Sequence, residues 1–134
     1  MTLKLTKSDL GKFSQLVQVD QHVLITDARL DSESDRGPNP HDLYDASLAA
    51  CKAITLLMYA ERANIPLDAV SISIERDSSE EHVGKYHLHV QVTFEGGLDA
   101  DEKNRLESVA ARCPIHKLMT TSQTTITTSV PVIA

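Results

Sequence analysis

The sequence predicts an α+β protein in which antiparallel strands surround one buried central helix. The first observation behind this is a long run, residues 46–60, in which all but three residues are apolar. A helix that is apolar on every side has no face to give to water and is expected in the core. The second is strict alternation of apolar and polar residues over 70–76 and 86–94, which is typical of strands with one buried face.

The totals predict a single domain over residues 1–134, large enough for a modest core. The net charge of −6 argues against non-specific binding to nucleic acid, and we see no basic patch for an anionic membrane. Residues 1–13 lack the apolar core of a secretion signal, so we expect a cytoplasmic protein with reduced thiols. There, two cysteines are more often inert core residues or catalytic residues than a structural disulfide.

Two apolar segments near the N-terminus predict a β-hairpin. Residues 15–20 and 22–30 are rich in Val, Leu and Ile, and Asp20 with Gln21 makes an acceptable tight connection. A polar loop over 31–37, dense in charge and serine, separates this hairpin from the central helix.

The central helix is expected from about Pro40 to Ala63. Asn39 is a good N-cap, and Pro40 suits the first helical position. The residue before Pro66 resists the helical region, so the helix ends there. Lys52 interrupts the apolar run, which is also too short to span a bilayer. A seam of small residues would let another helix approach closely. The seam consists of Ala46, Ala49, Ala50 and Ala53.

The C-terminal third predicts a second helix, a short helix and a last strand. Asp99, with Glu102 three residues later, forms a capping box at the start of the second helix. That helix stops at Cys113, a short helix follows over 114–119, and a Thr-rich strand is expected over 123–130. The resulting order of elements is ββ-α-ββ-α-β.

The two cysteines are the first candidates for chemistry. Free cysteines usually behave as small core hydrophobes, and that interpretation stays open for both. Cys113 precedes Pro114 and is placed to cap the short helix, where the helix dipole favours a thiolate. Cys51 lies twelve residues past Asn39, ~18 Å along the helix, so a cation from elsewhere would have to activate it.

The histidines give weaker signals. His87 and His89 share one face of a strand, but no nearby Cys or acid completes a ligand set, so we interpret them as an exposed face. His116 follows Cys113 in a Cys-Pro-Ile-His run, but a zinc site of two Cys and two His would need the pairs to meet in space, and neither pair has the tight spacing of structural zinc sites. We therefore expect no metal site, and no nucleotide or phosphate motif is present.

Two motifs resemble those of a known family. Residues 39–62, NPHDLYDASLAACKAITLLMYAER, resemble the signature helix of the OsmC/Ohr family, the osmotically inducible and organic hydroperoxide resistance proteins. Residues 113–119, CPIHKLM, resemble the family's second cysteine motif, and the spacing of 62 residues between Cys51 and Cys113 agrees. The loop before the helix and the strands VSISIERD and YHLHVQVTF fit the same layout, so the likeness covers nearly the whole chain.

The resemblance implies an OsmC-like fold, an intertwined homodimer and a thiol-based peroxidase that acts on organic hydroperoxides. Cys51 matches the family's reactive cysteine, and Cys113 matches its resolving partner. The resemblance implies that the oxidised Cys51 forms a disulfide with Cys113. A small dithiol or lipoyl-type reductant would then reduce this disulfide, with no cofactor. The apolar surroundings of Cys51 suit an alkyl hydroperoxide better than hydrogen peroxide.

Two positions depart from the family pattern. Many members carry a glutamate two places after the Asn of the Asn-Pro pair, and it holds an arginine beside the thiolate. Here that place is His41, and the nearest carboxylate is Asp42. Arg29 is expected to supply the cation if the loop carries a small insertion, and Arg36 is the alternative.

Two functions therefore stay open. The paired cysteines favour a peroxidase. The missing glutamate favours a dimeric binding protein that keeps the fold and an apolar pocket but performs no peroxide chemistry.

Overall fold

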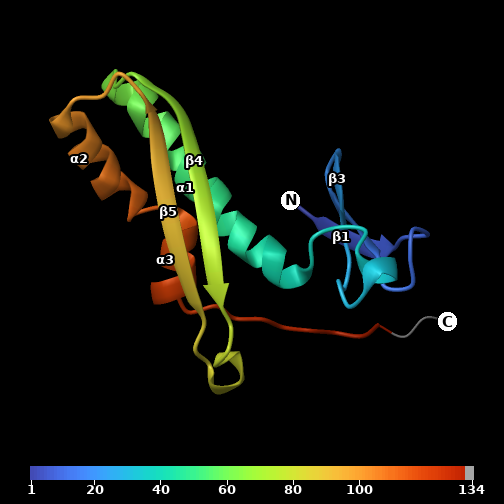
Figure 1. Cartoon of the computed structure of the whole chain (residues 1–134). Coiled ribbons are helices and arrows are strands. Elements are labelled where there is room, and N and C mark those ends of the chain that lie inside the picture. Colours follow the sequence, from blue (N-terminus) through green and yellow to red (C-terminus); the bar gives the residue numbers. More distant parts are fainter. Residues whose placement is uncertain (132–134) are drawn as a thin grey trace. The chain divides into compact units, whose positions relative to one another are not determined.

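The computed structural model describes residues 1–131 and divides into two compact units (Figure 1). The first unit comprises residues 1–47 and 77–88, and the second comprises residues 48–76 and 89–134. The long helix α1 (Pro40–Ala63) begins in the first unit and continues into the second.

A three-stranded antiparallel sheet forms much of the first unit. Its strands are β1 (Leu3–Lys7), β2 (Gln15–Val19) and β3 (His22–Thr26), and they pair in the order β1-β2-β3. The turn between β2 and β3 passes through Asp20, whose φ of 53° lies in the left-handed region that aspartate tolerates. The predicted hairpin is therefore confirmed.

Two features of this sheet differ from the prediction. Strand β1 was not expected from the sequence, because all of its residues are exposed and it lacks the buried face that alternation reveals. In addition, β3 ends at Thr26 and does not reach Leu30. The chain turns there because the buried Asp27 carboxylate accepts hydrogen bonds from the backbone N–H groups of Ala28 and Arg36.

Helix α1 has the predicted bounds because both of its ends are encoded locally. The Asn39 side chain accepts a hydrogen bond from the Asp42 backbone N–H at 2.8 Å, and the Asp42 carboxylate accepts one from the Asn39 N–H at 2.9 Å. This reciprocal pair caps the helix. At the other end Asn64 takes a φ of 55°, a left-handed conformation that stops the helix.

The described chain buries one face of α1 and leaves the opposite face exposed. Leu48, Lys52, Leu56 and Ala60 line the buried face. On the other side Ile54 and Met58 are 57% and 55% exposed, although the sequence predicts burial all round. The reason is that the core packs against one side of the helix only. By length and composition α1 would also qualify as a membrane span, a test that core helices of soluble proteins pass too.

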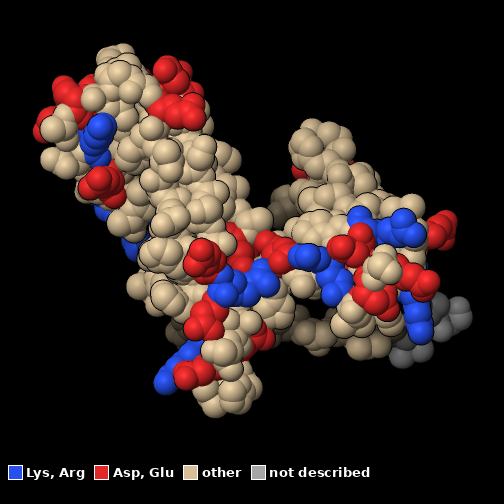
Figure 2. Space-filling view, viewed as in Figure 1, with Lys and Arg blue, Asp and Glu red and all other residues tan. Residues whose placement is uncertain are grey.

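Strands β4 (Leu67–Asp77) and β5 (His87–Gly96) form a second antiparallel sheet, as the alternation predicts (Figure 1). Their connection contains a short 3₁₀ helix, Glu81–Val83. The apolar positions of both strands are half-buried, whereas the alternate positions, among them His87 and His89, are exposed. Figure 2 shows that this outward face is largely uncharged, while basic and acidic side chains are interspersed elsewhere on the visible surface.

Two helices follow the second sheet. Helix α2 (Ala100–Ala110) begins at the predicted capping box of Asp99 and Glu102, and α3 (Pro114–Thr121) begins at Cys113. The predicted strand over 123–130 is wrong for the described chain. These residues are exposed and form no strand pairing, because a strand needs a neighbouring strand for its backbone hydrogen bonds.

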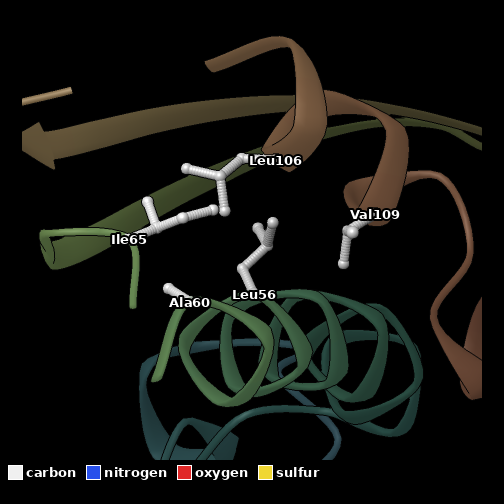
Figure 3. Packing of buried hydrophobic residues seen from close by; sticks show 5 residues of the cluster. All are labelled: Leu56, Ala60, Ile65, Leu106 and Val109. Atoms are coloured by element: carbon white, nitrogen blue, oxygen red, sulfur yellow. The ribbon is translucent and has the colours of Figure 1, made fainter. Parts of the chain in front are cut away.

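The core of the second unit lies between α1, α2 and the β4–β5 sheet. Figure 3 shows Leu56 and Ala60 of α1 pointing toward Leu106 and Val109 of α2, with Ile65 at one end. Several half-buried apolar residues of the two strands pack against this cluster. They include Leu67, Val70, Val92 and Phe94.

We expect Leu56→Ala to lower the free energy of unfolding by about 2–5 kcal/mol, because it opens a cavity at a fully buried position. Leu30→Ala is the matched control: Leu30 is 74% exposed, and its loss should change stability by less than about 0.5 kcal/mol. Urea denaturation followed by circular dichroism measures both. Equal losses in the two variants would show that this core is not the stabilising centre of the chain.

Candidate functional site

The thiol of Cys51 lies in the middle of α1. Cys51 is half-buried and unbridged, and its Sγ lies 4.0 Å from the Thr55 hydroxyl one turn later. A thiol at this level of exposure is reachable by a small reagent while most of its surroundings are protein. The position is therefore suited to a reactive sulfur that needs a partly apolar environment.

The thiol of Cys113 occupies the N-cap of α3, as the sequence predicts. Cys113 is unbridged and has no exposed surface, and its Sγ accepts a hydrogen bond from the His116 backbone N–H at 3.4 Å. Pro114 at the first helical position fixes the start of the helix. The Cys113 sulfur therefore lies at the N-terminal end of α3, in contact with a backbone N–H of its first turn.

A third functional group, which was not among the candidates expected from the sequence, is the amine of Lys52 in the second unit. Lys52, the residue after Cys51, is only 5% exposed. Its Nζ donates hydrogen bonds to the Ala110 carbonyl oxygen at 2.6 Å and to His116 Nδ1 at 3.1 Å. A single charged residue in an otherwise apolar run was the signal in the sequence for a buried, partnered amine.

The first unit holds Arg29 between two carboxylates. Its Nη1 lies 2.7 Å from Asp42 Oδ2, and its Nε lies 3.2 Å from Asp35 Oδ1. The hydrogen bond to Asp42 and the negative charges of Asp42 and Asp35 raise the pKa of Arg29 above its ordinary value, so its charge is permanent. Asp42, the residue after His41, thus holds this arginine.

The backbone around Arg29 is shaped by a tight turn. Arg29 has a φ of 55°, and its N–H donates to the Ser34 carbonyl oxygen at 2.7 Å. Asp31 caps the short 3₁₀ helix Ser32–Ser34 that completes the turn. Arg36, the alternative arginine, is exposed and contributes its backbone N–H to Asp27.

His41 points to a different part of the first unit. Its Nε2 lies 2.8 Å from Glu81 Oε1, and its ring lies 6.1 Å from that of Tyr86. These residues help to line an open pocket of about 400 Å³ at the start of α1. The pocket is lined by Pro40, His41, Tyr44, Glu81, Gly84 and Tyr86.

The candidate residues therefore fall into two groups. Arg29, His41 and Asp42 belong to the first unit, whereas Cys51 and Cys113 belong to the second. Among residues 1–131, no three His, Cys, Asp or Glu side chains gather closely enough to hold a metal ion.

The fold and its thiols define a class of protein: an α+β chain with one free cysteine in the middle of its long helix and another at a helix N-cap. The chain belongs to the OsmC-like protein family, whose sequence model matches residues 32–129. The matched range contains both cysteines, His41 and Asp42, and it begins three residues after Arg29.

Solved structures have the same fold. The OsmC-like protein of Mycoplasma pneumoniae is 20% identical with a TM-score of 0.71, and the match covers 90% of this chain and 86% of that chain. The organic hydroperoxide resistance protein OhrB of Bacillus subtilis is 24% identical with a TM-score of 0.54, covering 90% and 92%. The organic hydroperoxide resistance protein OsmC of Legionella pneumophila is 20% identical with a TM-score of 0.58, covering 90% of each chain. No curated protein is significantly similar.

Proposed function

We propose that this protein is a thiol-dependent peroxidase that reduces organic hydroperoxides, with Cys51 as the attacking sulfur and Cys113 as the resolving sulfur. The observation that carries this proposal is the pair of free thiols in an OsmC-like chain, one half-buried in the middle of α1 and one at the N-cap of α3. Two of its structural relatives are organic hydroperoxide resistance proteins, which supports the same substrate class.

The proposed cycle uses only thiol chemistry. The Cys51 thiolate attacks one oxygen of the hydroperoxide, the O–O bond breaks, and the leaving alkoxide takes a proton to become an alcohol. Cys51 is then a sulfenic acid. The Cys113 thiol condenses with it, a disulfide forms and water leaves. A small dithiol or lipoyl-type reductant of the cytoplasm restores both thiols by exchange, so no cofactor is required.

Arg29 is the proposed source of the positive charge near the Cys51 thiolate. It is held by Asp42, which lies nine residues before Cys51, or ~13 Å along a straight helix. His41 lies ten residues before Cys51, ~15 Å away along the same axis. These lengths are too great for contact along one helix, and they favour delivery of Arg29 from a second copy of the chain.

The proposed assembly is a homodimer that covers the exposed face of α1. Ile54 and Met58 project from this face, and Ala46 and Ala50 on the same helix are also exposed. Small residues flanked by large apolar ones allow close helix packing across a two-fold axis. In such a dimer each site would take its cysteines from one chain and its Arg29–Asp42 pair from the other.

An alternative function is supported by the pocket at the start of α1. There His41 stands where many relatives have glutamate, and it pairs with Glu81 beside the rings of Tyr44 and Tyr86. A dimeric binding protein could use this open, largely apolar pocket of about 400 Å³ for a ligand and leave both thiols unused.

A thiol count with intact mass separates the two functions. For the peroxidase, one equivalent of cumene hydroperoxide should remove both thiols of each chain and lower the mass by two hydrogen atoms, because a disulfide forms. An equivalent of hydrogen peroxide should react more slowly, since the surroundings of Cys51 are apolar. Two unchanged thiols after the organic hydroperoxide would contradict the peroxidase and favour the binding protein.

A further inference from the structure

We infer that Lys52 is a positioning residue for the resolving step. Its buried amine holds the corner between α2 and α3, residues 110–116, which carries Cys113, so that this sulfur can reach Cys51. The inference rests on the proposed function in one respect, the pairing of Cys51 with Cys113 during turnover. It adds a residue outside the pair of cysteines and the arginine, and it concerns the second step of the cycle.

Lys52 forms hydrogen bonds on both sides of the segment that carries Cys113. Ala110 is the last residue of α2, and His116 lies in the first turn of α3. Each is three residues from Cys113, one before it and one after it. A single Nζ that donates to the Ala110 carbonyl oxygen and to His116 Nδ1 therefore fixes both sides of the corner at once.

The end of α2 explains why a cation belongs at this place. The carbonyl groups at the end of α2 carry the negative end of its dipole, which a lysine ammonium complements. Burying an ammonium costs the hydrogen bonds it makes with water, and here the Ala110 carbonyl oxygen and the His116 ring replace two of them. Because an ammonium only donates, Nδ1 of His116 is the acceptor in this pair.

His116 connects the amine to the sulfur. Its ring accepts the Lys52 hydrogen bond, while its backbone N–H donates to Cys113 Sγ at 3.4 Å. Lys52 also follows Cys51 directly on α1. One turn of α1 therefore carries both Cys51, the sulfur that Cys113 attacks in this step, and Lys52, the amine that positions Cys113.

Placement of this kind matters for disulfide closure. The Cys113 thiolate attacks the Cys51 sulfur, the S–O bond of the sulfenic acid breaks, and the departing hydroxide takes a proton to become water. Such a step depends steeply on alignment, and a displacement of about 1 Å can slow a reaction by roughly a hundredfold. The first step, attack of Cys51 on a hydroperoxide, does not involve Cys113 and should be insensitive to Lys52.

The test uses the aromatic disulfide DTNB, which follows closure without any hydroperoxide. With one equivalent per reduced chain, the half-buried Cys51 reacts first, forming a mixed disulfide and releasing one thionitrobenzoate. Cys113 then attacks the Cys51 sulfur of that mixed disulfide and displaces the second thionitrobenzoate. For the wild type we expect two resolved phases of release.

Lys52→Met removes both hydrogen bonds at similar side-chain length. We expect its first phase to be unchanged and its second phase to be slower by about tenfold or more. His116→Phe keeps a ring but loses the acceptor, and it should slow the second phase as well. His116→Asn retains an acceptor close to the place of Nδ1, and it should restore much of the rate.

The outcomes are decisive in each case. A folded Lys52→Met protein with a wild-type second phase overturns the inference, as does equal behaviour of His116→Phe and His116→Asn. If Lys52→Met does not fold, the His116 pair decides alone, because His116 is only half-buried and Lys52 still reaches Ala110. Absence of a second phase in the wild type also overturns it. A wild type that closes the disulfide with DTNB but ignores hydroperoxides contradicts the proposed peroxidase and leaves the role of Lys52 intact.

Discussion

Cys51→Ser is expected to abolish the reduction of cumene hydroperoxide, because the attacking sulfur is lost. Cys113→Ser should still complete the first oxidation and then stop with a sulfenic acid on Cys51. Dimedone should trap that acid, and mass spectrometry of the digested protein should place one adduct on the peptide that contains Cys51.

The matched experiment treats Cys51→Ser in the same way. No adduct is expected on Cys113, which is fully buried in the described chain. Cys113 is nonetheless the other free thiol of the described chain, and a backbone N–H contacts its sulfur. A dimedone adduct on Cys113 in Cys51→Ser, with none on Cys51 in Cys113→Ser, would therefore reverse the two roles.

Arg29→Ala should slow hydroperoxide reduction by roughly tenfold or more, because a nearby cation favours the thiolate and stabilises the departing alkoxide. The rate of Cys51 alkylation by iodoacetamide should be measured against pH in the Cys113→Ser background. We expect the rise of this rate to occur at higher pH in Arg29→Ala. Asp42→Asn should give a smaller loss, since it leaves the cation in place but removes the carboxylate 2.7 Å from it. Arg36→Ala is the control and should behave as wild type. The opposite pattern would assign the role to Arg36.

A mixed dimer tests whether Arg29 crosses between chains. Cys51→Ser and Arg29→Ala are each expected to be weak or inactive alone. After the two are refolded together, one site of each heterodimer should regain both Cys51 and Arg29, so activity should return. An active, folded monomer at nanomolar concentration, or a heterodimer without recovery, would contradict shared sites.

Local signals made the long helix and the second sheet predictable. The start of α1 is marked by Asn39 and Pro40, and its end by Pro66 a few residues beyond the helix. Alternation alone identifies β4 and β5. By contrast β1 is exposed and has no periodic buried face, so only its pairing with β2 reveals it. The residues after α3 have a strand-like composition, but strand formation depends on a neighbour that sequence pattern cannot supply.

The candidate site was predictable to a similar extent. Cys51 and Cys113 stand in motifs, and Pro114 after Cys113 indicates the N-cap that the structure contains. The partners of Lys52 are 58 and 64 residues away along the chain, so nothing local could identify them. The choice of Asp42 as the partner of Arg29 likewise depends on how the loop between them folds.

The double use of Asp42 links the integrity of one helix end to the position of a cation. The same carboxylate accepts the Asn39 N–H that closes the cap of α1 and the Arg29 guanidinium. Fraying of the first turn, a low-energy local opening in most helices, would release the arginine while the core around Leu56 stays intact. Catalytic competence would then be lost under milder heating or lower denaturant than the global fold, and the start of α1 would set the working temperature range of the protein.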